Sequence, residues 1–269
     1  MTFAYVVLSH YPQYEYDLVK TLFNAKNDVI FIRDFEDWKY NWIKYYYTGK
    51  SLIDKINIIK DLDYDYVMLI DGDDILTDTL IERADYLASI GDFDKYGMVK
   101  FMSYKIKEDN SSLFSIWYAI KKHLDWHSTG TVFRTDMVYA YSNYSVDKQI
   151  FFNFLNSGEP MKLETLDDGR YWYKRKHNSR MSFDKFIIKD KEKYIDFHFN
   201  SLKTWYFLLD GVQNNNALSY VSYNIITEMS MLNLLDFKKV LSLMFKLKLI
   251  NLPIHYLQSK INNINVSSE

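Results

Sequence analysis

The sequence predicts an α/β fold with a mostly parallel central sheet flanked by helices and followed by a C-terminal helical extension. Apolar, strand-like segments alternate with segments of helical periodicity through residues 1–90, as in strand–helix–strand units. The strand-like segments are apolar at consecutive positions, as strands buried on both faces are. After residue 183 the chain is rich first in charge and then in Leu, Met, Phe and Tyr, without strand alternation. We therefore expect an α/β domain over residues 1–183 and a helical extension over residues 184–269.

Three strands and three helices are expected in the first half of this domain. The strands are expected at residues 4–9, 28–33 and 66–71, and the helices at residues 12–25, 50–62 and 79–90. Apolar residues recur at helical spacing in each helix, as Leu52, Ile56 and Ile59 do in the second. Ser51 is a candidate N-cap for that helix, and Gly91 follows the third helix as a stop signal.

The rest of the chain is less regular. Further strands are expected at residues 98–104, 131–134 and 171–176, and a helix at residues 145–155, before Gly158. In the extension, residues 234–249 place apolar side chains among lysines, a composition typical of interfacial helices. This segment could contact a membrane surface, pack on the α/β domain or form a homodimer. The cluster Tyr45, Tyr46 and Tyr47 also favours a membrane contact.

The composition excludes several kinds of protein. Hydrophobic residues make up 48% of the 269 residues, enough for a packed core, and the net charge of −2 does not indicate a nucleic-acid binder. The absence of cysteine excludes disulfides, thiolate metal sites and cysteine nucleophiles, and it fits a reducing cytoplasm. The start of the chain has no signal-peptide pattern, and no apolar run approaches the ~20 residues that span a bilayer. We expect a soluble cytoplasmic protein, or one held peripherally at the inner face of the membrane.

The most informative segment is residues 66–74, an apolar strand that ends in Asp71, Gly72, Asp73 and Asp74. In an α/β sheet, the C-terminal ends of such strands open into the crevice where ligands bind. Carboxylates gathered there repel one another unless a cation or a proton intervenes, so the segment suits a divalent metal that holds a phosphorylated substrate. The same Asp-x-Asp spacing recurs within residues 61–65 and 92–94 without a preceding strand. A solvated turn explains the acids at residues 61–65 and 92–94. It is also the alternative interpretation of residues 71–74.

Four segments carry a pattern that belongs to a known family. The strand that ends at residues 71–74 is similar to a strand ending in Asp-Ser-Asp-Asp, and Asp34 follows the second strand where the family has an acid. Residues 126–134, with Asp147 at a following helix start, are similar to its acceptor-side loop, and residues 173–182 to its last-strand ending. Together these segments resemble the family 2 glycosyltransferases, which have the GT-A fold, over residues 1–182.

Three departures from the family pattern are visible. Residues 9–12 read Ser-His-Tyr-Pro where the family has Pro-Thr-Tyr-Asn. Val146 replaces the first acid of a Glu-Asp pair, and Lys174 is an extra residue in the last-strand ending. These departures concern the contacts with the donor more than the class of reaction.

The resemblance implies transfer of a sugar from a nucleoside diphosphate sugar, with UDP favoured, to a hydroxyl of a glycan or lipid-linked glycan, with inversion. It implies Mn²⁺ or Mg²⁺ as cofactor and a surface glycan or polysaccharide as product. Asp73 would bind the metal, Asp71 would face the nucleotide, and Asp34 would read the base. The other implied contacts are Asn57, Arg175 and His177 with the donor, His177 also with the metal, and Trp126, His127, Ser128 and Thr129 with the acceptor.

Asp147 is the candidate general base. A carboxylate in the first turn of a helix is stabilised as the anion by the helix dipole and by free N–H groups, so it stays ready to accept a proton. One base without a second nucleophilic carboxylate fits inversion. The alternative is an ordinary acid at a helix start with Ser145 as the cap. Asp125 and Asp136 are weaker candidates for the base.

Two other functions remain open at this point. Residues 71–78 loosely resemble the nucleophile loop of haloacid-dehalogenase phosphatases, with Asp167 and Asp168 as a later acid pair. That class has the loop on its first strand, whereas here two strand–helix units come first, and Asp74 stands where it usually has Gly. The second alternative is a non-catalytic scaffold subunit, because fold does not dictate function.

Overall fold

The computed structural model describes residues 1–37, 39–49, 51–102, 112–122, 128–165, 172–174 and 191–232. The chain divides into two compact units, residues 1–177 and 178–269, whereas the sequence analysis placed the division after residue 183.

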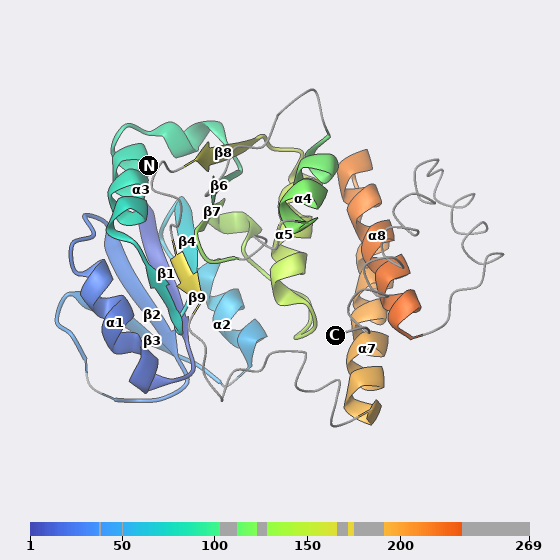
Figure 1. Ribbon diagram of the computed structural model, residues 1–269, viewed down its shortest axis with the longest axis horizontal. Helices are drawn as coiled ribbons and strands as arrows, with labels where there is room; N and C mark the ends of the chain where they lie inside the picture. The colour runs from blue at the N-terminus through green and yellow to red at the C-terminus, as the bar shows by residue number, and fades with distance from the viewer. Residues whose placement is uncertain are drawn as a thin grey trace. The chain divides into compact units, whose positions relative to one another are not determined.

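The first unit is built on a seven-stranded sheet with the strand order β3-β2-β1-β4-β7-β6-β8 (Figure 1). Strands β3, β2, β1 and β4 are parallel neighbours, β7 is antiparallel to both β4 and β6, and β8 is parallel to β6. The bounds are β1 Phe3–Ser9, β2 Asp28–Arg33, β3 Ile43–Tyr47, β4 Tyr66–Asp71, β6 Met98–Met102, β7 Thr131–Arg134 and β8 Met161–Thr165. The predicted mostly parallel sheet is confirmed.

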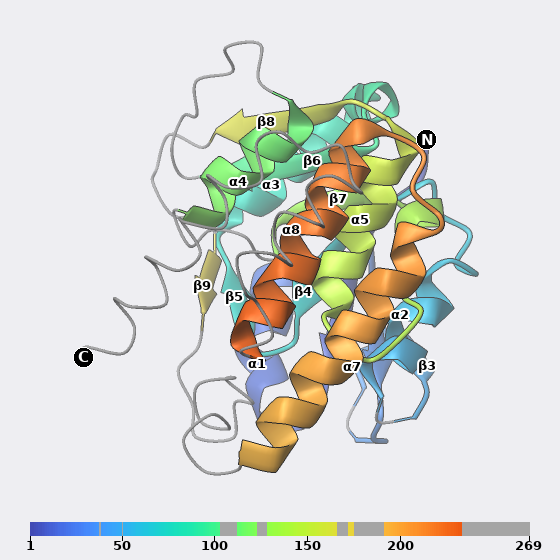
Figure 2. The ribbon, with the colours of Figure 1, turned by 90° about the vertical axis from the view of Figure 1, so that its right-hand side faces the viewer.

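Helices cover both faces of this sheet. Helices α1 and α3 lie on one face and α2 and α5 on the other, as the two views show (Figures 1 and 2). The bounds are α1 Pro12–Leu22, α2 Leu52–Ile59, α3 Asp78–Ser89, α4 Leu113–Lys122 and α5 Val146–Ser157, with short 3-10 helices at Asp92–Lys95 and Thr135–Met137. Of the five α-helices in the described part of this unit, four were predicted, and α4 was not.

The core between β1 and the α1/α3 layer contains one buried polar link. Phe3, Tyr5 and Val7 alternate along β1 and belong to the same apolar cluster as α1 and α3. The hydroxyl of Tyr5 donates to Oδ1 of the buried Asp85 at 2.9 Å, and the backbone N–H of Lys26 donates to Oδ2 of Asp85 at 2.8 Å. Asp85 therefore fixes α3 to the start of β2 and to the middle of β1.

The helix ends follow some of the predicted signals and not others. Gly91, with φ 67°, and Gly158, with φ 75°, adopt the left-handed conformation just past α3 and α5, as expected of helix stops. Ser145 and Ser51 cap no helix through their side chains. At α2 the cap is Asn143, which accepts the N–H of Ile53 at 3.1 Å and the hydroxyl of Ser51 at 2.6 Å. A cap from 90 residues away cannot be seen in the local sequence.

The tyrosine cluster at residues 45–47 forms the edge strand β3, which the sequence analysis missed. Five residues rich in aromatics suit a strand, but they show neither alternation nor a long apolar run. The ring of Tyr45 lies 4.3 Å from the guanidinium carbon of Arg33, and Tyr46 and Tyr47 are exposed. A sheet edge accounts for this cluster.

A second, two-stranded sheet joins β5, Asp74–Leu76, to β9, Trp172–Lys174. The strands are antiparallel, and Asp74 is paired with Lys174. Strand β9 lies within the strand predicted at residues 171–176, whereas β5 was not predicted. Lys174, the residue before Arg175, thus pairs with Asp74, which lies just after the end of β4.

The second unit contains the helices α7, Lys191–Leu209, and α8, Asn215–Met231, which pack against each other. The rings of Trp205 and Tyr220 meet edge to face with centroids 5.7 Å apart. Asn214 caps α8 by accepting the N–H of Ala217 at 3.0 Å. None of the helices in the described ranges is long and apolar enough to cross a membrane. The segment at residues 234–249 lies outside those ranges, so its role stays a prediction.

Candidate active site

The acid turn, residues 71–74, lies where β4 and β1 end side by side. Leu8 pairs with Asp71, and the backbone N–H of Gly72 donates to the carbonyl of Leu8 at 3.0 Å. A Cβ on Gly72 would lie 2.9 Å from Cα of Ser9, closer than real Cβ contacts allow. Only glycine fits there without displacing β1. The turn therefore presses against β1 at Gly72, while Asp71 and Asp73 on either side remain partly exposed.

Asp74 has a different environment from the two acids before it. Its side chain is fully buried, and Oδ2 accepts the hydroxyl of Thr129 at 2.7 Å. The same Thr129 oxygen accepts the backbone N–H of Asp71 at 3.1 Å. One buried hydroxyl therefore binds both ends of the acid turn, and Asp71 and Asp73 are the partly exposed carboxylates of this turn.

Asp147 lies in the first turn of α5 and hydrogen-bonds to the side chain of Ser128, the residue next to Thr129. Desolvation by the surrounding protein raises the pKa of Asp147, while Ser128 and the charges of Lys148 and Lys100 act in the opposite direction. Because Asp147 is itself exposed, solvent moderates the effect. An exposed carboxylate with a raised pKa accepts a proton more readily than an ordinary aspartate.

Lys100 binds the segment that contains Ser128 and Thr129. It lies in the middle of β6 and is fully buried, and its ammonium donates to the carbonyl of Thr129 at 3.3 Å and to the hydroxyl of Thr131 at 3.0 Å. The dipeptide Ser128–Thr129 is thus held by a buried cation on one side. On the other side it holds the acid turn and Asp147.

A second polar cluster lies at the ends of β1 and β2 and consists of His10, Asp34 and Lys55. Nζ of Lys55 lies 3.3 Å from Oδ1 of Asp34 and 2.9 Å from Nδ1 of His10. Burial alone would raise the pKa of Asp34, but Lys55 and His10 hold it below its ordinary value. Asp34 is therefore an ionised acceptor. Burial and the charge of Lys55 lower the pKa of His10, while Asp34 and Asp73 act in the opposite direction.

Next to this cluster, Arg33 and Glu15 form a fully buried ion pair. Nε of Arg33 donates to Oε1 of Glu15 at 3.0 Å, and a second contact joins the other nitrogen and oxygen. Burial raises the pKa of Glu15, although Ser9 and Arg33 oppose the rise. The pair fastens α1 to the C-terminal end of β2, the strand that Asp34 follows.

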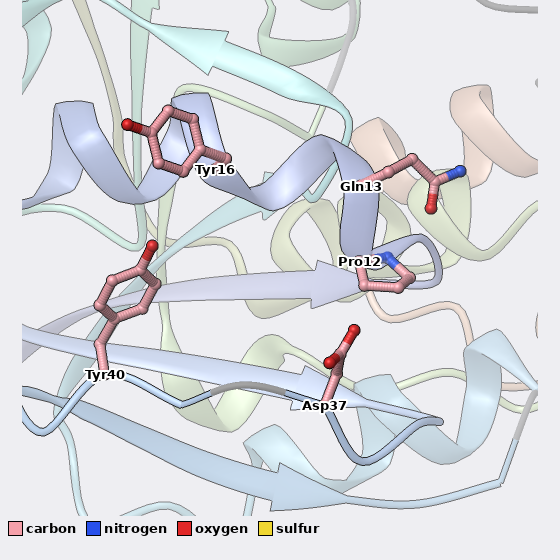
Figure 3. A pocket seen from close by; sticks show the side chains of 5 residues that line it. All are labelled: Pro12, Gln13, Tyr16, Asp37 and Tyr40. Atoms are coloured by element: carbon pink, nitrogen blue, oxygen red, sulfur yellow. The ribbon is translucent and has the colours of Figure 1, made fainter.

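A cavity of about 530 Å³ opens between the start of α1 and the loop after β2 (Figure 3). The side chains that line it are mostly aromatic or polar: Pro12, Gln13, Tyr16, Asp37 and Tyr40. Tyr16 and Tyr40 lie on opposite sides of it, and Asp37 points toward Pro12. Two of the lining residues, Pro12 and Asp37, lie close in sequence to His10 and Asp34, respectively.

The chemistry of the acid turn fits a divalent cation. Asp71 and Asp73 offer hard carboxylate oxygens, and Mg²⁺ sites commonly need only one or two protein carboxylates beside phosphate oxygens and water. Within the described ranges no group of three His, Cys, Asp or Glu side chains could hold a metal by itself. A metal at this turn would therefore depend on ligands from the substrate or from His177, which lies outside those ranges.

Comparison with known proteins decides the fold. No protein-family model and no curated protein matches the sequence. The crystal structure of S. aureus TarS 1–349 in complex with UDP-GlcNAc matches over 96% of this chain and 79% of that one, with TM-score 0.55 and 12% identity. The UDP complex matches with TM-score 0.50 and 12% identity, over 96% and 81% of the two chains. A longer TarS structure matches with TM-score 0.51 and 13% identity, and 49% of its length is covered.

The chain has the GT-A fold. At 12% identity the likeness establishes the architecture, and the chemistry has to be argued from the residues of this chain.

Four of the predicted site residues lie at one edge of the sheet: Asp71 and Asp73 at the end of β4, Asp34 after β2, and Asp147, which binds Ser128. Ser128 and Thr129 are there too, but both are buried, and their hydroxyls hold the acids. The prediction that Thr129 faces an acceptor is not compatible with its complete burial. Four others, Trp126, His127, Arg175 and His177, lie outside the described residues, as does Asp125.

Two further predicted residues have partners away from the acid turn. Asn57 donates to the carbonyl of Ala140 at 3.2 Å and accepts its N–H at 3.0 Å, so it joins α2 to the segment before α5. We therefore leave Asn57 out of the proposed donor site. Asp136 accepts two hydrogen bonds from Arg134, at 2.7 and 3.0 Å, on an exposed surface. That pairing does not suit a general base.

The sequence analysis missed Lys55 and Lys100, although a signal for each was present. Lys55 follows Leu52 by three positions and precedes Ile59 by four, so it lies on the apolar face of α2. Lys100 is the central residue of the apolar strand β6. A lysine in a position that the pattern buries has to find acceptors inside the protein, and such positions are candidates for functional or supporting roles.

Proposed function

We propose that this protein is an inverting, metal-dependent glycosyltransferase that moves a sugar from a nucleoside diphosphate sugar to a hydroxyl of a glycan acceptor. The observation that carries the proposal is the loop at Ser128 and Thr129, which binds the acid turn through one residue and Asp147 through the next. A donor site and a base held by one loop suit a reaction that joins two substrates.

The donor is proposed to be a UDP-sugar. Asp34 is ionised, and an ionised carboxylate can only accept hydrogen bonds. It suits a base that offers an N–H at N3, as uracil does, whereas cytosine has an acceptor at N3 and offers its N–H groups at N4. TarS structures contain UDP-GlcNAc and UDP, which supports uridine for a protein of the same fold.

Asp73 is the proposed metal ligand, and Asp71 faces the nucleotide beside it. When bound, Mn²⁺ or Mg²⁺ would offset the negative charge that develops on the departing nucleoside diphosphate. Arg175 and His177 follow Lys174, the partner of Asp74 in β9, and remain proposed contacts of the diphosphate and the metal. These acids and the metal hold the donor, and they leave the proton of the acceptor to another group.

Asp147 is proposed to take that proton. The acceptor oxygen forms a bond to the anomeric carbon while the bond from that carbon to the β-phosphate oxygen breaks, and the bonding electrons leave with the nucleoside diphosphate. The hydroxyl proton moves to the carboxylate of Asp147. Attack opposite the leaving group inverts the anomeric centre. The hydrogen bond from Ser128 fixes the carboxylate for this step.

The phosphatase alternative is less well supported, because its loop belongs to a different fold and Asp74, next to its proposed nucleophile turn, is buried. A non-catalytic scaffold would keep the fold without needing Asp73 and Asp147. The experiment therefore measures release of UDP from a panel of UDP-sugars with Mn²⁺, with and without glycan acceptors.

Asp147→Asn should bind UDP as the wild type does and release no UDP from the donor sugar in the presence of acceptor, whereas Asp73→Asn should lose metal-dependent binding. Asp136→Asn is the matched control, and it should behave as the wild type. Wild-type turnover by Asp147→Asn would refute the base assignment. Failure of every nucleoside diphosphate sugar to bind would favour a scaffold.

A further inference from the structure

Lys55 is a buried lysine with three polar neighbours. Its side chain has no exposed surface, and it points from α2 to the ends of β1 and β2. An ammonium group has three N–H donors and must satisfy them inside the protein when water is absent. Lys55 donates to the carbonyl of Ser9, its Nζ lies 2.9 Å from Nδ1 of His10, and it forms an ion pair with Oδ1 of Asp34 at 3.3 Å.

This arrangement determines which form of His10 is present. Because Lys55 has only hydrogens to offer, Nδ1 of His10 has to accept, and the ring is then neutral with its hydrogen on Nε2. The 3.5 Å approach of Nδ1 to Asp34 is therefore not a donated hydrogen bond. The side chain of His10 is 34% exposed, so a fixed N–H donor remains available to a ligand.

The same contact fixes Asp34. Oδ1 is held by the Lys55 charge, and the side chain is 11% exposed, so one small part of the carboxylate can meet a ligand. Rotation of the carboxylate would break the ion pair. Asp34 thus presents one acceptor in one orientation at the end of β2.

We propose that Lys55 is a positioning residue that fixes Asp34 as an acceptor and His10 as a neutral donor for the nucleotide, and so sets nucleobase selectivity without touching the donor. The proposal rests on the proposed function, because it assumes that a nucleotide binds beside Asp34. A lysine that only fastened α2 to the sheet would affect all nucleotides equally, so selectivity separates the two roles.

The first test is Lys55→Met, which keeps the length of the side chain and removes its donors. Titration calorimetry with UDP and CDP, each with Mn²⁺, should show affinity for UDP falling about tenfold or more, while CDP changes little. At saturating UDP-sugar, kcat should stay close to the wild-type value while KM rises. Lys60→Met, an exposed lysine just past α2, is the matched control and should change neither constant.

The second test is Asp34→Asn, which keeps the size of the side chain. With Lys55 present, the amide oxygen should turn to the ammonium and the amide NH₂ should face the base. The preference should then shift from UDP toward CDP, because cytosine N3 is an acceptor. In the double variant Lys55→Met with Asp34→Asn, the amide is no longer oriented, and the shift should disappear.

The outcomes distinguish failure of the proposed role of Lys55 from failure of the proposed function. If the wild type binds UDP and both Lys55→Met and Asp34→Asn keep its preference over CDP, the role of Lys55 is refuted while the proposed function stands. If Lys55→Met does not fold, Asp34→Asn still decides, since equal loss of both nucleotides would refute the orientation by Lys55. If the wild type binds no nucleoside diphosphate, both proposals fail together.

Discussion

The hydroxyl of Thr129 donates a hydrogen bond of 2.7 Å to Oδ2 of the buried Asp74. The same oxygen accepts the N–H of Asp71 at 3.1 Å, and the neighbouring Ser128 binds Asp147. Two adjacent residues therefore determine the distance between the acid turn and the proposed base. The burial of this loop and its contact with Lys100 hold it in place, as the proposed transfer between two substrates requires.

Thr129→Val should destabilise the protein by about 1–3 kcal/mol, because it leaves the buried carboxylate of Asp74 without this donor. It should also weaken binding of UDP in the presence of Mn²⁺, since the acid turn loses its anchor. Urea unfolding and titration calorimetry measure the two effects.

Thr135→Val is the control for this change. Thr135 is also buried, but its hydroxyl has no hydrogen-bond partner in the part of the chain that the structure describes. Its substitution should leave nucleotide binding intact and cost less stability. Equal effects of the two substitutions would show that the link between Thr129 and Asp74 has no special role.

Gly72→Ala should cost about 1–3 kcal/mol of stability and weaken nucleotide binding, because the new methyl group would push β1 away from the acid turn. At Gly211 a Cβ would meet nothing closer than 3.7 Å, so Gly211→Ala is the matched control. Thermal unfolding of both variants, with and without UDP and Mn²⁺, checks the prediction. A Gly72→Ala protein as stable as Gly211→Ala would argue against the close contact.

The two proposed acids should titrate in different ranges. Desolvation raises the pKa of Asp147, so kcat should fall as the pH drops through a value above the ~3.9 of an ordinary aspartate. The pKa of Asp34 is held low by Lys55, so the acid loss of UDP affinity that depends on Asp34 should begin at a lower pH. Steady-state profiles of kcat and direct binding measurements separate the two. A kcat profile without an acid limb above pH 4 would count against Asp147 as the base.

Glu15→Gln should destabilise the protein by about 3–5 kcal/mol, because it removes the carboxylate that forms an ion pair with the buried Arg33. Replacing both partners, Glu15→Leu with Arg33→Met, should restore most of that loss. Asp28→Asn breaks an exposed ion pair with Lys44 and should cost less than about 1 kcal/mol. Urea unfolding of these variants tests the ranking, and a double variant no more stable than Glu15→Gln would contradict it.

The sequence predicted best those features that a local pattern determines. Strands β1, β2 and β7 are apolar runs, and their predicted positions agree with the structure to within a residue. Strand β3 has an exposed aromatic face at the edge of the sheet, and α4 was not recognised as a helix. Strand β3 lacks the apolar run that identifies a strand buried on both faces.

For the site, the acid turn and Asp147 could be named because strand ends and helix starts are readable from the sequence. The direction in which Thr129 points could not, because it depends on β6, β7 and the acid turn meeting in space. Lys55 was overlooked although it interrupts an apolar helix face, since its partners at the ends of β1 and β2 are known only from the fold.

The most direct test of the central claim is titration calorimetry of UDP against the wild type and Asp73→Asn, each with and without Mn²⁺. The account predicts that the wild type binds UDP only when Mn²⁺ is present and that Asp73→Asn does not bind it under either condition. UDP binding of equal strength without metal, or in Asp73→Asn, would contradict a metal-dependent donor site at the acid turn.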